Sequence, residues 1–294
     1  MIKLIEFTLF GKIIPMNLKT KIGNLNLPNP VTVASGTFGN GEEMAELIDL
    51  RKLGGIFLKG TTLHPREGNS PQRVVETPSG LLNSIGLQNP GLEEVLKTKA
   101  PFVKKIGIPS IINISGTCSE EYAEMAAIIE SCDDVDAIEM NVSCPNVKQG
   151  GIAFGTEAKI LGEAVNQTRE ATQKPLIVKL SPNVTDITEM ARAAEANGAD
   201  GLSVINTLVG MVIDTKTRKP VLANKIGGLS GPAIRPVAVK LVWQVANTVK
   251  IPIFGIGGIE KLDDALVGAA RIAVQSLKLV IAHDRKKQSL KGEK

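Results

Sequence analysis

The sequence predicts an α/β fold, a (β/α)8 barrel with an N-terminal hairpin, from three observations. Short apolar runs recur along the chain, each is followed by a helical pattern, and polar residues collect where the runs end. Strands that alternate with helices form a parallel sheet, and eight such strands close into a barrel. An open doubly wound sheet is the alternative that this pattern leaves.

The length and composition are those of one large domain. The chain has 294 residues, of which 43% are hydrophobic, and barrels of this class commonly run to about 250 residues as one domain. A net charge of +4 and 3% aromatic residues argue against nucleic acid as a partner, because no basic stripe or stacking platform is indicated. No apolar run reaches the roughly 18 residues that a membrane helix needs.

The cysteines indicate a reducing compartment. Cys118, Cys132 and Cys144 are odd in number and lack CxxC spacing. This pattern is typical of neither a disulfide framework nor a structural zinc site. We therefore expect a cytoplasmic protein without a metal site.

The first predicted element is a hairpin over residues 20–27. Apolar and polar residues alternate there on both sides of Gly23 and Asn24, which form the expected turn. The strand candidates of the barrel follow it. They are the apolar runs at residues 31–33, 56–58, 111–114, 137–140, 176–178, 202–205, 253–256 and 272–274.

Two segments between these runs carry a clear helical spacing of apolar residues. Ser119 is the predicted N-cap of the first helix and Thr185 that of the second. Gly198 ends the second helix as a C′ glycine. The apolar positions are Tyr122, Met125, Ala126 and Ile129 in the first helix, and Ile187, Met190, Ala191 and Ala194 in the second.

The ends of the predicted strands hold the candidate functional residues. In a parallel barrel the active site lies at the carboxyl ends of the strands. Ordinary turn chemistry would explain any one polar residue there, but two lysines and three asparagines at equivalent ends favour a ligand site. The residues at these ends are Ala34, Ser35 and Gly36, then Lys59, Gly60 and Thr61, then Asn113, Asn141, Lys179, Asn206, Thr207, Gly257 and Gly258.

The stretch Asn-Val-Ser-Cys-Pro-Asn at residues 141–146 directly follows the fourth run. The thiolate of Cys144 can take up a proton, and Asn141 and Asn146 can each donate and accept hydrogen bonds to a planar amide ligand. A lone cysteine is more often a small buried hydrophobe. The two flanking asparagines and the pliable loop favour chemistry at Cys144.

Three further features indicate a ligand at the barrel mouth, and the first two of them indicate an anion. Lys59 and Lys179 each close an apolar strand, so we expect buried stems and ammonium groups that point into the barrel mouth. Gly231, Gly257 and Gly258 can present backbone N–H groups to a phosphate at the rim. Residues 83–91 are too polar and glycine-rich for a helix and long enough to fold over the site.

Four motifs, at residues 31–39, 83–91, 141–146 and 227–232, closely resemble those of class 1B dihydroorotate dehydrogenase catalytic subunits, from about residue 16 to residue 264. The resemblance implies a (β/α)8 barrel that binds FMN and oxidises dihydroorotate to orotate in pyrimidine (UMP) biosynthesis. It also implies an iron–sulfur, FAD-containing electron-transfer subunit that passes the electrons to NAD. The family expectation is a heterotetramer of two catalytic and two electron-transfer subunits.

The resemblance also assigns roles to individual residues. Cys144 resembles the base that removes the C5 proton while hydride leaves C6 for flavin N5, and Lys179 would lie near flavin N1. The implied substrate contacts are Lys59, Asn83, Ile85, Gly86, Leu87, Asn141, Asn146, Asn206 and Thr207. The implied FMN contacts are Ala34, Ser35, Gly36, Lys59, Gly60, Asn113, Asn141, Lys179, Ile205, Gly231, Gly257 and Gly258.

The chain departs from the family at both ends. Residues 1–15 precede the usual start and form a predicted extension, which leaves residues 16–294 as the single catalytic domain. After the seventh run the helix is short, and Ser276, Leu277 and Lys278 stand where the family has Gly-Thr in its phosphate cup. The eighth βα unit is therefore divergent or incomplete. Two alternatives follow: a catalytically impaired homologue with a defective phosphate site, or a related flavin enzyme that acts on another pyrimidine or on dihydrouridine in tRNA.

Overall fold

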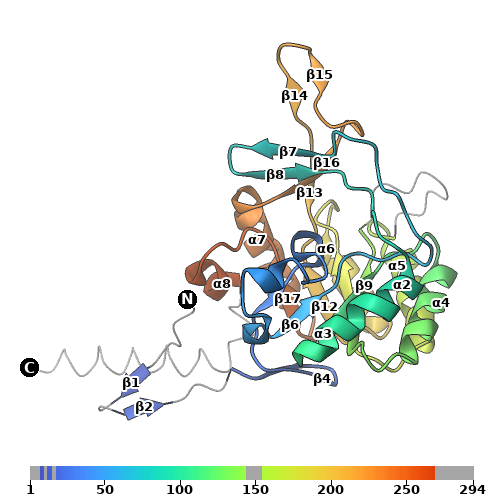
Figure 1. Ribbon diagram of the computed structural model, residues 1–294, viewed down its shortest axis with the longest axis vertical. Helices are drawn as coiled ribbons and strands as arrows, with labels where there is room; N and C mark the ends of the chain where they lie inside the picture. Colours follow the sequence, from blue (N-terminus) through green and yellow to red (C-terminus); the bar gives the residue numbers. More distant parts are fainter. Residues whose placement is uncertain (1–6, 10–11, 15–17, 144–153, 269–294) are drawn as a thin grey trace, which may run out of the picture.

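The computed structural model describes residues 7–9, 12–14, 18–143 and 154–268 (Figure 1). Its centre is a parallel sheet in which neighbouring strands follow one another in the sequence. This order is that of a (β/α) barrel, and the doubly wound alternative is wrong because that fold reverses its strand order at a switch point. The strands are β5 (Thr32–Val33), β6 (Gly55–Phe57), β9 (Ser110–Ile114), β10 (Ala137–Asn141), β11 (Leu176–Leu180), β12 (Gly201–Val204) and β17 (Ile253–Gly255).

Seven of the eight predicted runs thus lie in the sheet, and the eighth, residues 272–274, lies outside the described residues. Longer helices pack in sequence order, α4 against α5, α5 against α6, and α6 against α7. Their bounds are α4 (Ser119–Glu130), α5 (Ala158–Glu170), α6 (Ile187–Ala196), α7 (Arg235–Ala246) and α8 (Leu262–Gly268). The shorter segments are α1 (Ser35–Phe38), η1 (Met44–Glu46), η2 (Leu50–Lys52), α2 (Leu92–Glu94), η3 (Val95–Lys99), α3 (Ala100–Ile106) and η4 (Pro232–Ile234). None of the described helices is long and apolar enough to cross a membrane.

Both predicted N-caps are wrong by one residue. The N-cap of α6 is Asp186, whose carboxylate accepts a 2.8 Å hydrogen bond from the backbone N–H of Thr188. The N-cap of α4 is Cys118, which makes no side-chain cap; Glu121 instead accepts from the backbone N–H of Thr117 at 2.7 Å. A carboxylate is a stronger acceptor than a hydroxyl, and in both places it sets the start of the helix. Gly198 does follow α6 in the left-handed region, with φ of 99°.

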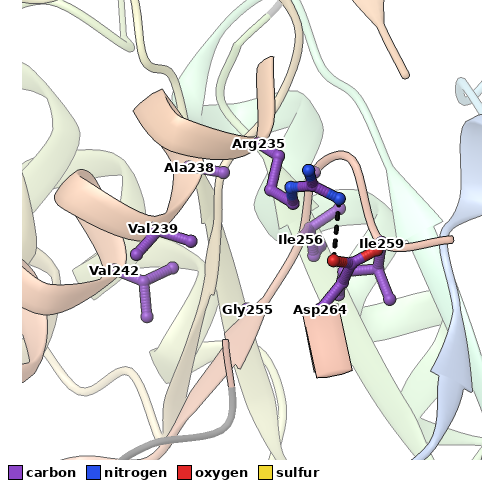
Figure 2. A pocket seen from close by; sticks show the side chains of 9 residues that line it. Arg235, Ala238, Val239, Val242, Gly255, Ile256, Ile259 and Asp264 are labelled. Carbon is purple, nitrogen blue, oxygen red and sulfur yellow. Dashed lines mark hydrogen bonds and ion pairs between the residues drawn. The ribbon is translucent and has the colours of Figure 1, made fainter. Parts of the chain in front are cut away.

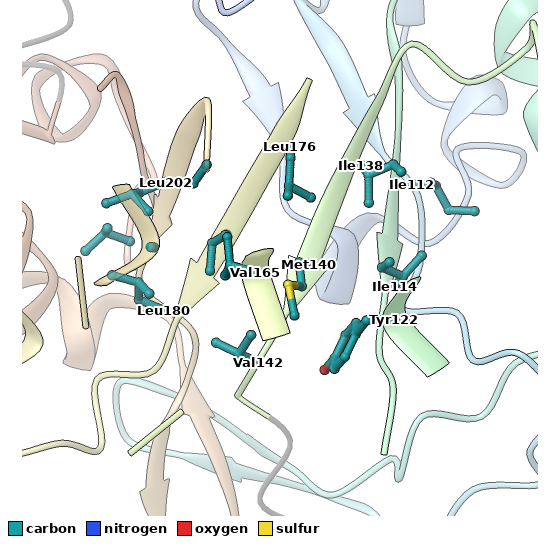
Figure 3. Close-up of a cluster of buried hydrophobic side chains, with 14 of the residues drawn as sticks. Ile112, Ile114, Tyr122, Ile138, Met140, Val142, Val165, Leu176, Leu180 and Leu202 are labelled. Atoms are coloured by element: carbon teal, nitrogen blue, oxygen red, sulfur yellow. The ribbon is translucent and has the colours of Figure 1, made fainter. Parts of the chain in front are cut away.

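Alternation along the strands creates two separate apolar cores. Residues on the outer face, such as Ile112, Ile138 and Leu176, pack under the helices, and Figure 3 shows part of this outer core. Residues on the inner face, such as Ile111 and Ile177, line the barrel interior. A two-residue period on a sheet buried on both faces accounts for both sets.

The predicted hairpin closes one end of the barrel. It consists of β3 (Thr20–Ile22) and β4 (Leu25–Leu27). Its Ile22, Leu25 and Leu27 are buried in one cluster with Phe57, Ile111, Ala137, Ile177 and Phe254 from the inner face of the sheet. Each fully buried aliphatic side chain contributes about 1.5–3 kcal/mol. The amino-terminal end of the barrel is therefore sealed, and ligands must enter at the opposite end.

A second, antiparallel sheet lies at the opposite end of the molecule from β4, and the sequence did not predict it (Figure 1). Its order is β13 (Leu208–Gly210), β16 (Gly227–Ser230), β8 (Gly80–Asn83) and β7 (Val74–Thr77). It joins the segment after β6 to the segment after β12. Two further pairs are β14 (Ile213–Asp214) with β15 (Lys219–Pro220), and β1 (Phe7–Leu9) with β2 (Lys12–Ile14), the latter within the predicted extension.

Candidate active site

The barrel interior changes from apolar to charged within one layer of side chains. Two residues beyond Ile111, Ala137 and Ile177 on the same strand face come Asn113, Glu139 and Lys179, all buried. Strand β12 adds the buried Ser203, opposite Lys179 in the register. A period of two residues predicts this arrangement once the strands are known. The charged layer faces the open end of the barrel.

A row of side-chain amides crosses this layer. The Asn113 Nδ2 group donates a hydrogen bond to Glu139 Oε2, and Asn141 Nδ2 donates to Asn113 Oδ1 at 3.5 Å. Asn206 Nδ2 in turn donates to Asn141 Oδ1 at 3.2 Å. The structure thus brings together three asparagines that the sequence placed at three separate strand ends.

Lys179 pairs with an acid that the sequence analysis missed. Its Nζ atom lies 3.8 Å from Glu139 Oε2, and the two side chains are 7% and 0% exposed. Glu139 sits inside an apolar run, so the sequence pattern predicts a strand residue there and not a site residue. The signal that could have found it is its spacing of two from Asn141, which places both on the inner face.

The end of β10 is held tightly. The Tyr122 hydroxyl donates to the backbone carbonyl of Asn141 at 2.7 Å, and the ring of this buried residue packs edge-on against Phe154. The Ser143 N–H donates to Asn141 Oδ1 at 3.2 Å, and the Ser143 hydroxyl donates to the Lys179 carbonyl at 3.2 Å. The backbone and amide of Asn141 are therefore fixed. Cys144 and Asn146 lie outside the described residues.

The antiparallel sheet adds a wall to the site. Asn83 Nδ2 donates to the carbonyl of Gly228 at 3.3 Å, and the Thr207 N–H donates to Asn206 Oδ1 at 2.8 Å. A Cβ atom on Gly228 would lie 2.1 Å from Thr207 Oγ1, so only glycine fits between these two residues. The predicted substrate residues Asn83, Asn206 and Thr207 therefore lie close together, on either side of Gly228.

The loop over residues 84–91 approaches the amides from the β6 side. A Cβ on Gly60 would lie 3.1 Å from Asn113 Oδ1 and 3.2 Å from Leu87 Cδ2, so Leu87 reaches the charged layer. The Ile85 carbonyl accepts a hydrogen bond from Asn69 N–H at 2.9 Å, and Gly86, with φ of 77°, turns tightly against the same asparagine. The prediction that these residues form a loop is confirmed, apart from Asn83, which ends β8.

Lys59 is half-buried at the edge of the site. Its backbone N–H donates to Asn40 Oδ1 at 3.0 Å, and it lines an open pocket of about 380 Å³. Ala34 to Gly36 run into the start of α1, where Ser35 is buried. Within the described residues, no hydrogen bond joins this turn to the amide row. Ile205 is buried and donates its N–H to the Ile256 carbonyl at 3.2 Å.

The glycines predicted to bind phosphate lie against the start of α7. Gly257 and Gly258 have φ of 126° and 69°, and Cβ atoms on them would come within 2.9 Å of Ala238 Cβ and 2.6 Å of Arg235 Cβ. Gly231, with φ of 95°, precedes η4, which leads into α7. Backbone N–H groups beside a helix N-terminus, without intervening side chains, suit an anion.

An ion pair fixes the loop that follows these glycines (Figure 2). Arg235 Nη1 on α7 lies 2.7 Å from Asp264 Oδ1 on α8, and Asp264 Oδ2 accepts from the N–H groups of Glu260 and Lys261 at 3.2 and 3.3 Å. Burial opposes ionisation of this carboxyl, but these backbone hydrogen bonds and the Arg235 charge outweigh it and lower the pKa of Asp264 below its ordinary 3.8. The ionised carboxylate of Asp264 therefore links the loop at residues 260–261 to Arg235 of α7.

We expect Asp264→Asn to lower the melting temperature at neutral pH, since the amide keeps one acceptor but loses the charge. Because the pKa of Asp264 is lowered on folding, its contribution is present above about pH 4, near the unfolded value, and is lost as the pH falls through the folded value. Thermal unfolding of both proteins across an acid titration measures this. The two melting temperatures should converge at the acid end of the titration. A difference between them that stays constant with pH would contradict a stabilising role of the ionised Asp264 carboxylate.

The described residues fit a flavin mononucleotide on two counts. The close-packed glycines leave backbone donors for its phosphate, and a buried lysine provides a cation for the ring. In addition, Glu139 Oε1 and Ser203 Oγ are buried without a hydrogen-bond partner in the described part of the chain. Buried polar atoms are nearly always paired in proteins, so these two are consistent with a polar ligand in the barrel mouth.

Comparison with known proteins identifies close relatives. Residues 17–277 match the model of a family described as dihydroorotate dehydrogenase; that range includes the eighth strand candidate. The chain is 55% identical over 269 residues to the "Dihydroorotate dehydrogenase B (NAD(+)), catalytic subunit" of Desulforamulus reducens, which is 90% of this chain and 88% of that protein. Proteins of the same name from Trichlorobacter lovleyi and Bacteroides fragilis are 55% and 54% identical, each over 88% of this chain and 86% of the relative.

Proposed function

Because the chain belongs to the dihydroorotate dehydrogenase family, we propose that it oxidises dihydroorotate to orotate in pyrimidine biosynthesis, with FMN as its bound cofactor. The observation that carries the proposal is the row of asparagine amides beside Lys179 in the barrel mouth. The relatives, matched over nearly their whole length, bear the name of this activity. Family membership implies a flavin; the glycines beside α7 favour a mononucleotide, since they provide one phosphate site.

FMN, when bound, would supply the acceptor for the hydride that leaves C6 as the C5–C6 bond of dihydroorotate becomes a double bond. In this proposal Cys144 takes the proton from C5, in the segment that follows the fixed end of β10. Lys179 would supply a positive charge near flavin N1, where negative charge develops as the flavin is reduced. The backbone of Gly231, Gly257 and Gly258 would hold the phosphate. Ala34, Ser35, Gly36, Gly60 and Ile205 would be further cofactor contacts.

The substrate ring has amide and imide edges that both donate and accept, and carboxamides match such edges. Asn141, Asn206 and Thr207 belong to one hydrogen-bonded group, and Asn83 donates to the carbonyl of Gly228, which packs against Thr207. Asn146 is assigned the same role. Lys59 suits the substrate carboxylate, since it is a cation at the edge of the site. Ile85, Gly86 and Leu87 complete the pocket from the loop side.

The partner in this proposal is an iron–sulfur, FAD-containing subunit that passes the electrons to NAD. The relatives are named as NAD-linked catalytic subunits, and such a name implies a second subunit. We propose two copies of each subunit in the complete enzyme, and a cytoplasmic location, where dihydroorotate is available.

The function is tested with the purified protein after incubation with FMN and removal of the excess. Anaerobic dihydroorotate should bleach the flavin absorbance with formation of one orotate for each flavin. Dihydrouracil, which lacks the carboxylate, is the matched control and should bleach it far more slowly. Flavin that stays oxidised with dihydroorotate would overturn the proposal, and protein that retains no FMN would favour the impaired homologue.

A further inference from the structure

We propose that Glu139 is a positioning residue of this site: its buried carboxylate determines which way round the three asparagine amides face the bound ligands, and it balances the charge of Lys179. The inference rests on the proposed function, because Asn141 and Asn206 of this row are assigned to the pyrimidine ring, and Asn113 to the flavin. Glu139 is a wholly buried residue on the inner face of β10, directly opposite Asn113 in the register.

The first step is the direction of the Asn113 amide. An ionised carboxylate has acceptors only, and the Asn113 side chain has one donor end and one acceptor end. Glu139 and Asn113 are directly opposite in the register of β9 and β10, so the carboxylate meets this amide at close range. The Asn113 Nδ2 group therefore faces Glu139, and Oδ1 faces away toward the barrel mouth.

The second step carries this direction through the row. Because Asn113 turns its Oδ1 atom toward Asn141, Asn141 must turn its Nδ2 group toward Asn113. The distance between these two atoms is 3.5 Å, the longest in the row. Asn141 Oδ1 then faces Asn206 Nδ2 at 3.2 Å. Each amide has its donor end toward Glu139 and its acceptor end away from it.

The far end of the row enforces the same order. Backbone N–H groups can only donate, and those of Ser143 and Thr207 donate to Asn141 Oδ1 and Asn206 Oδ1 at 3.2 and 2.8 Å. The Glu139 carboxylate at one end of the row can only accept, and the backbone N–H groups at the other end can only donate. One orientation of the three amides therefore satisfies every hydrogen bond in the row. The amide edges that remain for a ligand are therefore fixed before it binds, which is the preorganisation that selective binding needs.

Charge is the second part of the proposal. Lys179 and Glu139 form an ion pair in which both side chains are nearly or wholly buried. Such a pair contributes little to stability, and apolar residues of the same volume would often do as well. Its presence here is better explained by the site: the carboxylate holds the ammonium group in place and offsets its charge, which sets the potential of a flavin beside it.

The test is Glu139→Gln. This substitution keeps the shape of the side chain but removes its charge, and with it the constraint on which end of the Asn113 amide faces residue 139. The glutamine amide can turn either end to Asn113, so we expect orotate to bind about 10- to 100-fold more weakly, the range for losing one charge-assisted hydrogen bond. Orotate binding is measured on protein saturated with FMN, because Asn113 and Lys179, which contact Glu139, are also implied flavin contacts. The flavin midpoint potential should rise, since the charge of Lys179 is no longer offset.

Glu130→Gln is the matched control, since it makes the same chemical change at the opposite end of the barrel. Glu130, at the end of α4, accepts from the Thr172 hydroxyl and from the N–H groups of Gln173 and Lys174 at 3.0 and 3.4 Å. It should lower the melting temperature but leave the orotate affinity and the flavin potential at wild-type values. A purely structural role for Glu139 would give this same result.

The double variant Glu139→Gln with Lys179→Met removes both charges and so keeps the test available if the single variant fails to fold. Weak orotate binding should persist in it, because the amide row has still lost its anchor. Wild-type orotate affinity in either Glu139 variant would overturn the positioning role, and an unchanged potential in Glu139→Gln would overturn the charge role. If the wild-type protein neither binds orotate nor reacts with dihydroorotate, the proposed function fails instead.

Discussion

Replacing Lys179 with alanine should slow the reduction of bound flavin by dihydroorotate about 100- to 1,000-fold, the usual effect of removing one preorganised charge stabiliser. Lys179 is the cation in the charged layer, and it is held inside the barrel by Glu139. Its loss should also lower the flavin midpoint potential, since reduced flavin carries negative charge. Anaerobic stopped-flow absorbance measures the rate, and a reductive titration measures the potential.

The same variant should be less stable by about 3–5 kcal/mol, because it leaves Glu139 as a buried charge without its partner. Adding Glu139→Gln removes that charge and should restore much of the free energy of unfolding, while the reduction rate stays low. Denaturant unfolding of the single and double variants separates the two effects. Recovery of the rate together with the stability would show that Lys179 acts only through the fold.

Cys144→Ser should slow the same half-reaction at least about 100-fold, which is the typical value of a positioned base. A serine hydroxyl ionises far less readily than a thiol, so it removes the C5 proton poorly. Reoxidation of the reduced flavin by an external acceptor should be unaffected, because that step needs no proton from C5. Both half-reactions are followed in the same stopped-flow instrument.

Cys132→Ser is the control for this substitution, since Cys132 is a free, half-buried thiol just after α4, near the sealed end of the barrel. It should leave both half-reactions at the wild-type rate. Reduction of the Cys144→Ser protein at the wild-type rate would remove Cys144 from the mechanism, and equal losses in the two variants would point to thiol chemistry outside the site.

Most of the barrel could be predicted because its strands are local and strongly apolar. Runs such as residues 111–114 and 137–140 stand out between polar segments, and the hairpin carries its own turn signal. The antiparallel sheet gave no such signal, because β8 pairs with β16 far away in the sequence. In addition, two adjacent glycines such as Gly227 and Gly228 in β16 are typical of a loop and not of a strand. Glycine is required there by the packing of Thr207 and Asn83, which only the folded chain reveals.

The site was predicted in part for a related reason. Residues at strand ends, such as Asn113, Asn141 and Lys179, are visible because polarity begins where an apolar run stops. Glu139 was missed because it interrupts such a run, and a charge in mid-strand is ordinarily assigned to the solvated face. Its role depends on the neighbouring strand, where Asn113 stands opposite. The assignments of Cys144 and Asn146, and of the eighth βα unit, stay predictions.

The hairpin that seals the barrel has a consequence for synthesis on the ribosome. Residues Ile22, Leu25 and Leu27 emerge early, yet their cluster includes Phe254 of β17, which is translated near the end. At roughly 5–20 residues per second, the wait is about 10 to 45 s. During that interval the buried side chains of the hairpin can pack only against the strands that have already been made, so part of their apolar surface stays exposed. The nascent chain should therefore be a client of ribosome-associated chaperones until the last described strand is made.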